Sequence, residues 1–259
     1  MSAVEMCSII ENIEIAENIY ELTLRGELVQ LMEQPGQFVH VRVSSGIDPL
    51  LRRPLSIAKI DQVRSEFTLI YRKQGKGTDI LASRKKGEKI NILGPLGQGF
   101  PVLETKRGQT ALIVGGGIGV PPLFELSTQL VESGANVIHL FGFQSAKAIF
   151  YADQFRELGQ TLIATEDGSY GIRGYVTTIL TEHTLKFDTV YACGPHPMLK
   201  ALKTQMPNAT MFISLEERMG CGIGACYSCV CRTSDEDNPS SYKKVCSDGP
   251  VFAAKEVIL

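Results

Sequence analysis

The chain has 259 residues, of which 44% are hydrophobic and 21% are charged, and its formal net charge is −2. This length is enough for two domains with a substantial core, and the small net charge gives no electrostatic reason to expect nucleic acid as a partner. The first twenty residues lack the basic and apolar regions of a signal peptide, and the most apolar stretch, 111–124, is too short and too rich in glycine and proline to span a bilayer.

The first part of the chain, residues 1–102, is predicted to form an antiparallel β domain. Turn-forming residues such as Gln34-Pro35-Gly36 separate short runs of strand-forming residues. The candidate strands are 8–13, 19–24, 37–43, 56–60, 66–72 and 89–92. Six short strands at this spacing predict a small closed barrel, with one short helix at 79–84.

The second part, residues 103–214, alternates between strands and helices. Residues 110–114 are largely apolar, as expected of a strand that is buried on both faces. The further candidates are strands 136–142, 161–165, 189–193 and 209–214 and helices 120–132, 175–183 and 197–206. This rhythm predicts a doubly wound α/β domain with a parallel sheet, followed by a short segment at 215–259.

That last segment holds five of the seven cysteines of the chain. Cys221, Cys226 and Cys229 have the spacing C-x4-C-x2-C, and Cys246 follows at a distance. This is the plant-ferredoxin pattern for a [2Fe–2S] cluster. Structural zinc and a disulfide framework are the alternatives, although zinc sites usually show two short-spaced pairs of cysteines. The surplus thiols Cys231 and Cys7 are expected to ligate nothing.

The glycines of this loop suit a cluster of negative charge. Gly220, Gly222 and Gly224 let the chain turn tightly, so that successive backbone N–H groups point to one centre. Thiols kept for a metal, together with the missing export signal, indicate the reducing cytoplasm.

Two turns of the α/β domain are candidates for a nucleotide site. The turn Gly115-Gly116-Gly117-Ile118-Gly119 follows the first strand, where glycines let a phosphate approach the backbone and a helix N-terminus. Val120 stands where the third glycine of G-x-G-x-x-G would be, and no acidic residue ends the second strand. The turn Cys193-Gly194-Pro195 should border the same crevice. Each turn alone is also compatible with a purely structural role.

A nucleotide site and a cluster together require a cofactor that links them. Nicotinamide exchanges electrons as a hydride and a cluster exchanges them singly, so a flavin is expected between them. In the barrel, Arg53 is a candidate for a phosphate, and the strand that it opens would face the isoalloxazine ring. The other candidates are Pro54, Leu55, Ser56, Ile70, Tyr71, Arg72, Gly77 and Thr78. Tyr71 offers an aromatic face, and Thr78 offers a hydroxyl.

In this order and spacing, the motifs up to about residue 214 resemble the ferredoxin–NADP reductase superfamily. The resemblance implies that the barrel binds FAD through an Arg-x-aromatic-Ser motif and that the α/β domain binds the nicotinamide nucleotide. Leu55 replaces the usual aromatic residue, which leaves stacking on the flavin to another side chain. By resemblance only, Cys193 would lie near the nicotinamide ring.

The cysteine segment narrows the resemblance. The run 217–226, with Cys229 and the late run 246–252, is similar to the electron-transfer subunits of NAD-dependent dihydroorotate dehydrogenases. The resemblance implies a heterotetramer with two FMN-containing catalytic subunits, in pyrimidine (UMP) biosynthesis. Electrons from dihydroorotate would pass from FMN through the [2Fe–2S] cluster and FAD to NAD+. The partner is expected to dock at the lip 219–223.

Three alternatives stay open at this point. Subunits of sulfite reductase-like or ferredoxin-linked NAD(P)H oxidoreductases share this architecture, although an aspartate commonly replaces the first cluster cysteine in the ferredoxin-linked type. A zinc-stabilised regulatory subunit that senses redox state is the third. NAD is favoured over NADP because no arginine just after Gly142 is placed to meet a 2′-phosphate, although Lys147 weakens this argument. No side chain is assigned as a catalytic acid or base.

Overall fold

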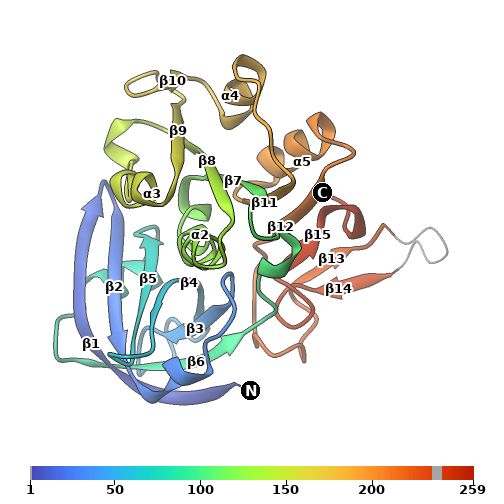
Figure 1. Ribbon diagram of the computed structural model, residues 1–259. Coiled ribbons are helices and arrows are strands. Elements are labelled where there is room, and N and C mark those ends of the chain that lie inside the picture. The colour runs from blue at the N-terminus through green and yellow to red at the C-terminus, as the bar shows by residue number, and fades with distance from the viewer. Residues whose placement is uncertain (1, 235–240) are drawn as a thin grey trace.

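A computed structural model describes residues 2–234 and 241–259 of the chain (Figure 1). Its first part is a closed barrel with the strand order β1-β2-β5-β4-β3-β6, in which neighbouring strands are antiparallel. The strands are β1 Ala3–Ala16, β2 Ile19–Arg25, β3 Phe38–Arg42, β4 Arg53–Asp61, β5 Glu66–Arg72 and β6 Lys89–Leu96. Helix α1, Lys76–Ala82, follows β5. The pairing of β1 with β6 closes the barrel and leaves it no open edge.

The second part is a seven-stranded sheet with the order β10-β9-β8-β7-β11-β12-β15. Its strands are β7 Thr110–Gly116, β8 Asn136–Phe143, β9 Gln160–Thr165, β10 Ile172–Arg173, β11 Thr189–Cys193, β12 Thr210–Ser214 and β15 Val251–Ala253. The helices are α2 Pro122–Glu132, α3 Ala152–Leu158, α4 Val176–Glu182 and α5 His196–Gln205. All strand pairs are parallel except β12 with β15. The barrel and the parallel α/β sheet confirm the predicted fold class.

The central strand β7 shows why the sheet is covered on both faces. Ala111 and Ile113 belong to one apolar cluster together with residues of α2 and α3, whereas Leu112 and Val114 belong to another with residues of α4 and α5. Successive side chains of a strand point to opposite faces, so a continuous apolar run needs a helical layer on each side.

The barrel and the α/β domain meet along β4 and α2. The ammonium of Lys59 lies 5.0 Å from the ring centre of Phe124 and 4.4 Å from that of Tyr151. Glu125 accepts a hydrogen bond of 3.0 Å from the backbone N–H of Ile60. These contacts fix the carboxyl ends of the sheet strands next to the barrel wall.

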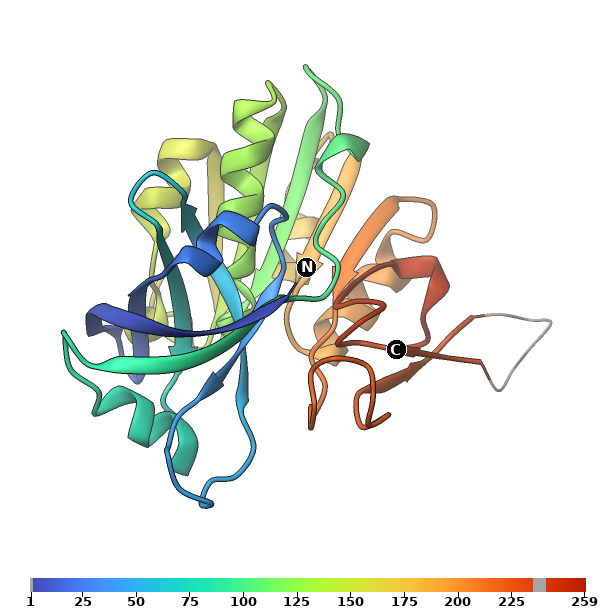
Figure 2. The ribbon, with the colours of Figure 1, turned by 90° about the horizontal axis from the view of Figure 1, so that it is seen from below.

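The tail of the chain returns to the sheet, which the sequence did not predict. Strands β13 Val230–Arg232 and β14 Tyr242–Lys244 form a two-stranded hairpin, and β15 then pairs antiparallel with β12 at the sheet edge. Figure 2 shows the cysteine-bearing loops, in orange and red, beside the barrel. The segment after β12 is therefore anchored at both of its ends by the sheet.

Other differences from the sequence-based prediction are local. Helix α3 was not predicted, because it has only seven residues and buries little besides Phe155.

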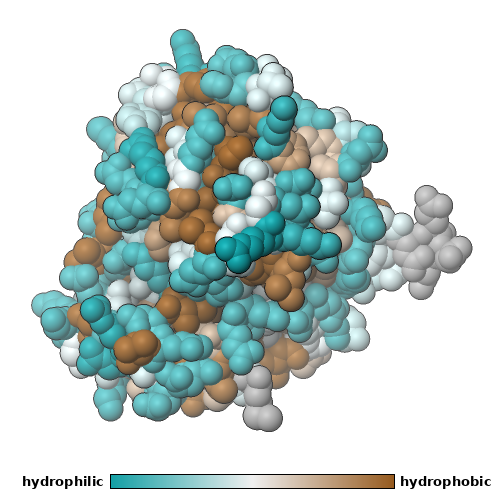
Figure 3. All heavy atoms as spheres, viewed as in Figure 1, coloured by the Kyte–Doolittle hydropathy of each residue, from teal (hydrophilic) through white to brown (hydrophobic). Residues whose placement is uncertain are grey.

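The face in Figure 3 mixes hydrophilic and hydrophobic residues. Within the described ranges, every helix falls short of the length and apolar character needed to cross a bilayer.

Candidate functional site

A cavity of about 290 Å³ lies between the barrel, the end of β12 and the beginning of the cysteine segment. Most of the barrel residues proposed for a flavin line it. They are Pro54, Leu55 and Ser56 of β4, Ile70, Tyr71 and Arg72 of β5, and Thr78 of α1. The structure therefore brings three separate barrel motifs to one wall.

Arg53 and Gly77 lie just behind this wall, in direct contact with each other. A Cβ atom on Gly77 would lie 2.4 Å from Nε of Arg53, so the guanidinium packs closely over the start of α1. Arg53 also donates a 2.7 Å hydrogen bond from Nη1 to the carbonyl of Leu51. The Thr78 hydroxyl accepts from the N–H of Gln74 and donates to the carbonyl of Gly75. A cation and a helix start thus meet beside the cavity, as binding of a phosphate requires.

Tyr71 lines this wall, but most of its ring is buried. It packs in the barrel core and stacks on Tyr20 at 5.7 Å. Its hydroxyl lies 3.0 Å from Oδ1 of Asn12, and burial raises its pKa.

A second cavity, of about 620 Å³, lies at the carboxyl ends of the parallel strands. Gly116, Gly117 and Gly119 line it on one side, and Gly194 and Pro195 line it on another. The two predicted turns therefore border one crevice. Gly115 does not line it, since this residue is buried within β7 and packs against Val120 and Phe141.

Gly119 has a steric reason to be glycine. A Cβ atom at this position would lie 2.4 Å from the carbonyl oxygen of Cys193 and 2.6 Å from the backbone nitrogen of Gly194. The start of α2 can approach the end of β11 only because no side chain intervenes. This contact holds the two glycine-containing turns together.

Cys193, which the resemblance places near the nicotinamide ring, is not one of the residues that line the crevice. Its side chain is buried beneath the turn. Burial raises the pKa of this thiol, which favours its neutral form. The tight turn at Gly194 is what reaches the cavity.

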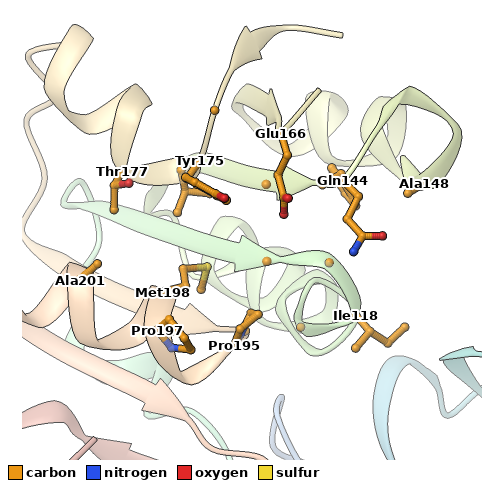
Figure 4. A pocket seen from close by; sticks show the side chains of 18 of the residues that line it. Ile118, Gln144, Ala148, Glu166, Tyr175, Thr177, Pro195, Pro197, Met198 and Ala201 are labelled. Atoms are coloured by element: carbon orange, nitrogen blue, oxygen red, sulfur yellow. The ribbon is translucent and has the colours of Figure 1, made fainter. Parts of the chain in front are cut away.

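The structure also shows lining residues that the sequence analysis missed. Gln144 follows β8 and Glu166 follows β9, and both line the crevice. Figure 4 shows them on the side opposite Pro195 and Met198. Their position one residue beyond a strand end was the available signal, because ligands of open α/β sheets gather there.

The two cavities adjoin, and three residues line both of them: Arg72, Ile118 and Glu216. The Arg72 guanidinium also lies against Gly117, where a Cβ atom would be 3.4 Å from Nη2. The Glu216 side chain is exposed within the cavities, yet surrounding protein removes enough solvent to raise its pKa, while His196 and Arg72 act in the opposite direction. The two cavities therefore meet at these three side chains.

The proposed cluster ligands form a third site next to the first cavity. Their sulfurs accept hydrogen bonds from backbone N–H groups of the loop: Cys221 from Ile223 at 3.4 Å and from Ala225 at 3.3 Å, and Cys246 from Gly224 at 3.2 Å. Burial acts to raise the pKa of Cys221, but these N–H groups and the neighbouring Cys226 outweigh it and lower that pKa to about 6. The loop is thus arranged to hold thiolates.

The four thiols are arranged in two pairs. Cys221 donates its backbone N–H to the sulfur of Cys226, and Cys246 donates to that of Cys229, both at 3.4 Å. Structural zinc uses four ligands around one centre, whereas each iron of a [2Fe–2S] cluster takes two protein ligands. The donor set and the inward N–H groups therefore fit a two-iron cluster.

The remaining thiols of interest lie apart from these pairs. Cys231 is in β13 and donates to the carbonyl of Lys243, with the sulfur and oxygen 3.6 Å apart. Cys7 is buried in the barrel core, where burial raises its pKa to about 12.

Comparison with known protein families identifies each part of the chain. Residues 6–100 match the oxidoreductase FAD-binding domain, residues 113–204 match the oxidoreductase NAD-binding domain, and residues 216–258 match the iron–sulfur cluster binding domain of dihydroorotate dehydrogenase B. These ranges contain the two cavities' motifs and the four paired cysteines.

Individual relatives cover nearly the whole chain. Dihydroorotate dehydrogenase B (NAD(+)), electron transfer subunit, from Bacillus cereus strain G9842 is 58% identical over 246 residues, which are 95% of each chain. The protein of the same name from Bacillus anthracis strain A0248 is 57% identical over the same share. Among solved structures, one of an NADH-dependent reduced ferredoxin–NADP oxidoreductase matches with a TM-score of 0.86 and 30% identity, and covers 98% of this chain and 90% of its own.

Proposed function

Because the chain belongs to the family of electron transfer subunits of NAD+-dependent dihydroorotate dehydrogenase B, we propose that it carries electrons from the FMN of a dihydroorotate-oxidising partner subunit, through a [2Fe–2S] cluster and FAD, to NAD+. The chain is an oxidoreductase subunit with FAD-binding, NAD-binding and iron–sulfur-binding domains. The route, the FMN and the role in pyrimidine biosynthesis are the proposed part.

One observation carries this route: the first cavity adjoins both other sites. It shares Arg72, Ile118 and Glu216 with the nucleotide crevice. On its other side it is lined by Met219, two residues before the first cluster cysteine. When bound there, FAD supplies the conversion between paired and single electrons that links nicotinamide to a cluster.

The residues of the chain are proposed to position the cofactors rather than to exchange protons. Arg53, packed over Gly77 at the start of α1, would meet a phosphate of FAD. Gly116, Gly117 and Gly119 would let the pyrophosphate of NAD approach the backbone. Hydride transfer depends on alignment of the two rings, so close contact along Arg72 and Ile118 matters more than any acid or base.

The three matched domains extend from residue 6 to residue 258. None of them is described as binding an organic substrate. The name of the relatives, electron transfer subunit, implies a catalytic subunit that supplies the electrons. We propose two copies of each subunit, and a cytoplasmic location, where thiols kept for a cluster stay reduced.

The proposed function is tested by anaerobic co-expression with an FMN-containing dihydroorotate dehydrogenase subunit. We expect a complex with two iron atoms and one FAD for each copy of this chain, which reduces NAD+ when dihydroorotate is added. The chain alone should oxidise NADH with an artificial dye, because that reaction needs only the FAD. A chain free of iron and FAD would overturn the proposal.

The likeness to the NADH-dependent reduced ferredoxin–NADP oxidoreductase supports a second candidate. In that case electrons would enter from a ferredoxin rather than from an FMN subunit. The higher identity of the Bacillus relatives favours the first proposal. Reduction of NAD+ by a reduced ferredoxin, without any dihydroorotate-oxidising subunit, would favour the second.

The lip around the cluster loop is our proposed docking surface for the partner. Ile223 lies within it and its side chain is 58% exposed, although it belongs to an otherwise well-anchored loop. We expect Ile223→Arg to weaken binding of the catalytic subunit by roughly 30-fold, the effect of losing an interface hot spot. Titration calorimetry or a pull-down with the FMN subunit measures this.

The matched control is Val63→Arg, since Val63 is 97% exposed in the turn between β4 and β5. This variant should bind the partner as the unchanged chain does. Equal affinity of the Ile223→Arg and Val63→Arg variants for the partner would remove the lip from the interface.

A further inference from the structure

His40, in the middle of β3, lies directly beneath the cysteine loop. Its side chain is 0% exposed. A Cβ atom on Gly222 would lie 2.7 Å from Cε1, 2.9 Å from Nδ1 and 3.0 Å from Nε2 of the imidazole. The edge of the ring that carries Cε1 between the two nitrogens therefore faces the loop, one residue after the ligand Cys221. Gly222 also has a φ of +75°, a backbone conformation that favours glycine. Both this conformation and the close contact with His40 therefore require glycine at this position.

Both ring nitrogens of His40 lack a hydrogen-bond partner in the described part of the chain. Burial, and to a lesser degree the charge of Arg52, lower the pKa of His40 to about 4, so the ring is neutral. A neutral imidazole has one N–H to donate and one lone pair to accept with. Leaving such buried groups unpaired costs free energy, because water would have satisfied them in the unfolded chain.

His139 shows what a purely structural buried histidine looks like in this protein. It is also 0% exposed, but Nδ1 lies 3.0 Å from the hydroxyl of Thr161 and Nε2 lies 3.1 Å from that of Ser127. If His40 only supported Gly222, a phenylalanine or leucine would do so without unpaired nitrogens. The polar atoms of His40 thus point to a partner that is not part of the chain.

The position of His40 limits what that partner can be. Phe38 and Pro54, its neighbours along β3 and across to β4, line the proposed flavin cavity, but His40 does not. The loop above it directs the N–H groups of Ile223, Gly224 and Ala225 to cysteine sulfurs. Of the groups that the proposed function requires, the iron–sulfur cluster is the one whose ligands lie in this loop.

We propose that His40 is a positioning residue for the [2Fe–2S] cluster: its ring supports the loop at Gly222, and its N–H donates a hydrogen bond to a cluster sulfur. The inference rests on the proposed function, since it requires the cluster. A hydrogen bond to a cluster sulfur stabilises the reduced form, which carries the extra negative charge, and so raises the reduction potential. The barrel wall would then tune the cluster as well as hold the flavin.

The first test uses the unaltered full-length chain, loaded with FAD and cluster and labelled with ¹⁵N-histidine. Pulsed EPR of the reduced cluster should show weak coupling to one histidine nitrogen. His40→Phe should lose this coupling, whereas the matched variant His139→Phe should keep it. A normal cluster signal without histidine coupling in the unaltered chain would overturn this inference and leave the proposed function standing. Absence of any cluster signal would overturn both.

The second test is the reduction potential of the cluster. We expect His40→Phe to shift the one-electron equilibrium with a dye of fixed potential about tenfold toward the oxidised cluster, which is about 59 mV. His40→Gln, which keeps an N–H donor, should restore part of this shift. A cluster-containing His40→Phe variant with the potential of the unaltered chain would refute the hydrogen bond. If His40→Phe does not retain the cluster, the histidine coupling measured in the unaltered chain decides whether the hydrogen bond exists.

Discussion

Replacement of Cys246 by alanine is expected to abolish the [2Fe–2S] cluster and with it the transfer of electrons from dihydroorotate to NAD+. Cys246 accepts the N–H of Gly224 and donates its own N–H to the sulfur of Cys229, so it joins the late segment to the loop. Loss of a residue outside the ligand shell costs about 10–100-fold in metal affinity or activity, and loss of a ligand should cost more. We expect at least a roughly 100-fold fall in dihydroorotate-dependent NAD+ reduction.

The iron content, the visible spectrum and the steady-state rate of the complex measure this effect. Oxidation of NADH by an artificial dye should persist, because FAD and the nucleotide crevice are unaltered. Cys231→Ala is the matched control, since Cys231 is 8% exposed and Cys246 is 2% exposed, so both substitutions remove a buried thiol. Equal iron contents in the two variants would contradict the assignment of Cys246.

In the chain without its cluster, we expect the thiol of Cys246 to be hard to ionise. Burial and the adjacent Cys229 raise the pKa of Cys246 to about 12. The thiol is therefore protonated at neutral pH, and cluster binding must release its proton.

Substitution of Gly119 by alanine is expected to damage the nucleotide crevice and the stability of the α/β domain together. The new Cβ atom would lie 2.4 Å from the carbonyl oxygen of Cys193, and neither backbone segment can rotate away as a side chain can. Overpacking of this kind costs about 1–3 kcal/mol in the free energy of unfolding. The start of α2 must move away from β11, so we expect NAD+ to bind roughly tenfold to a hundredfold more weakly, as if a charge-assisted hydrogen bond were lost.

Chemical denaturation and titration with NAD+ measure the two effects. Gly46→Ala serves as the control, because the nearest atom to a Cβ there is 3.6 Å away and the backbone does not have a positive φ. Unchanged NAD+ affinity in Gly119→Ala would show that the contact with β11 does not shape the crevice.

The sequence was most informative where chemistry demands a fixed spacing. The positions of Cys221, Cys226 and Cys229 predict two-iron ligation because a single short loop must supply three thiolates. The alternation of strands and helices predicts the parallel sheet because a strand such as β7 is apolar throughout only when both its faces are covered. Both features depend on local pattern: the structure contains the parallel sheet, and the match of residues 216–258 to an iron–sulfur cluster binding domain supports the cluster.

Sequence motifs were less reliable about which atoms reach a cavity. Gly115 and Cys193 belong to the predicted turns, but Gly115 lies within β7 and Cys193 is buried beneath the turn at Gly194. Tyr71 belongs to the predicted flavin wall, but most of its ring is buried in the barrel core. Inward or outward orientation depends on strand register, and register is fixed by distant pairing. Glu166 and His40 became candidates only once the fold had placed them.

The pairing of β15 with β12 has a consequence for how the protein is made. Every strand of the barrel and every parallel strand of the sheet precedes Cys246 in the chain, so those layers can form during synthesis while the ligand set is still incomplete. Until β15 arrives, the outer side of β12 presents unpaired backbone groups, which invite association with other chains. Maturation of the metal centre and protection against aggregation are therefore completed by the same few residues.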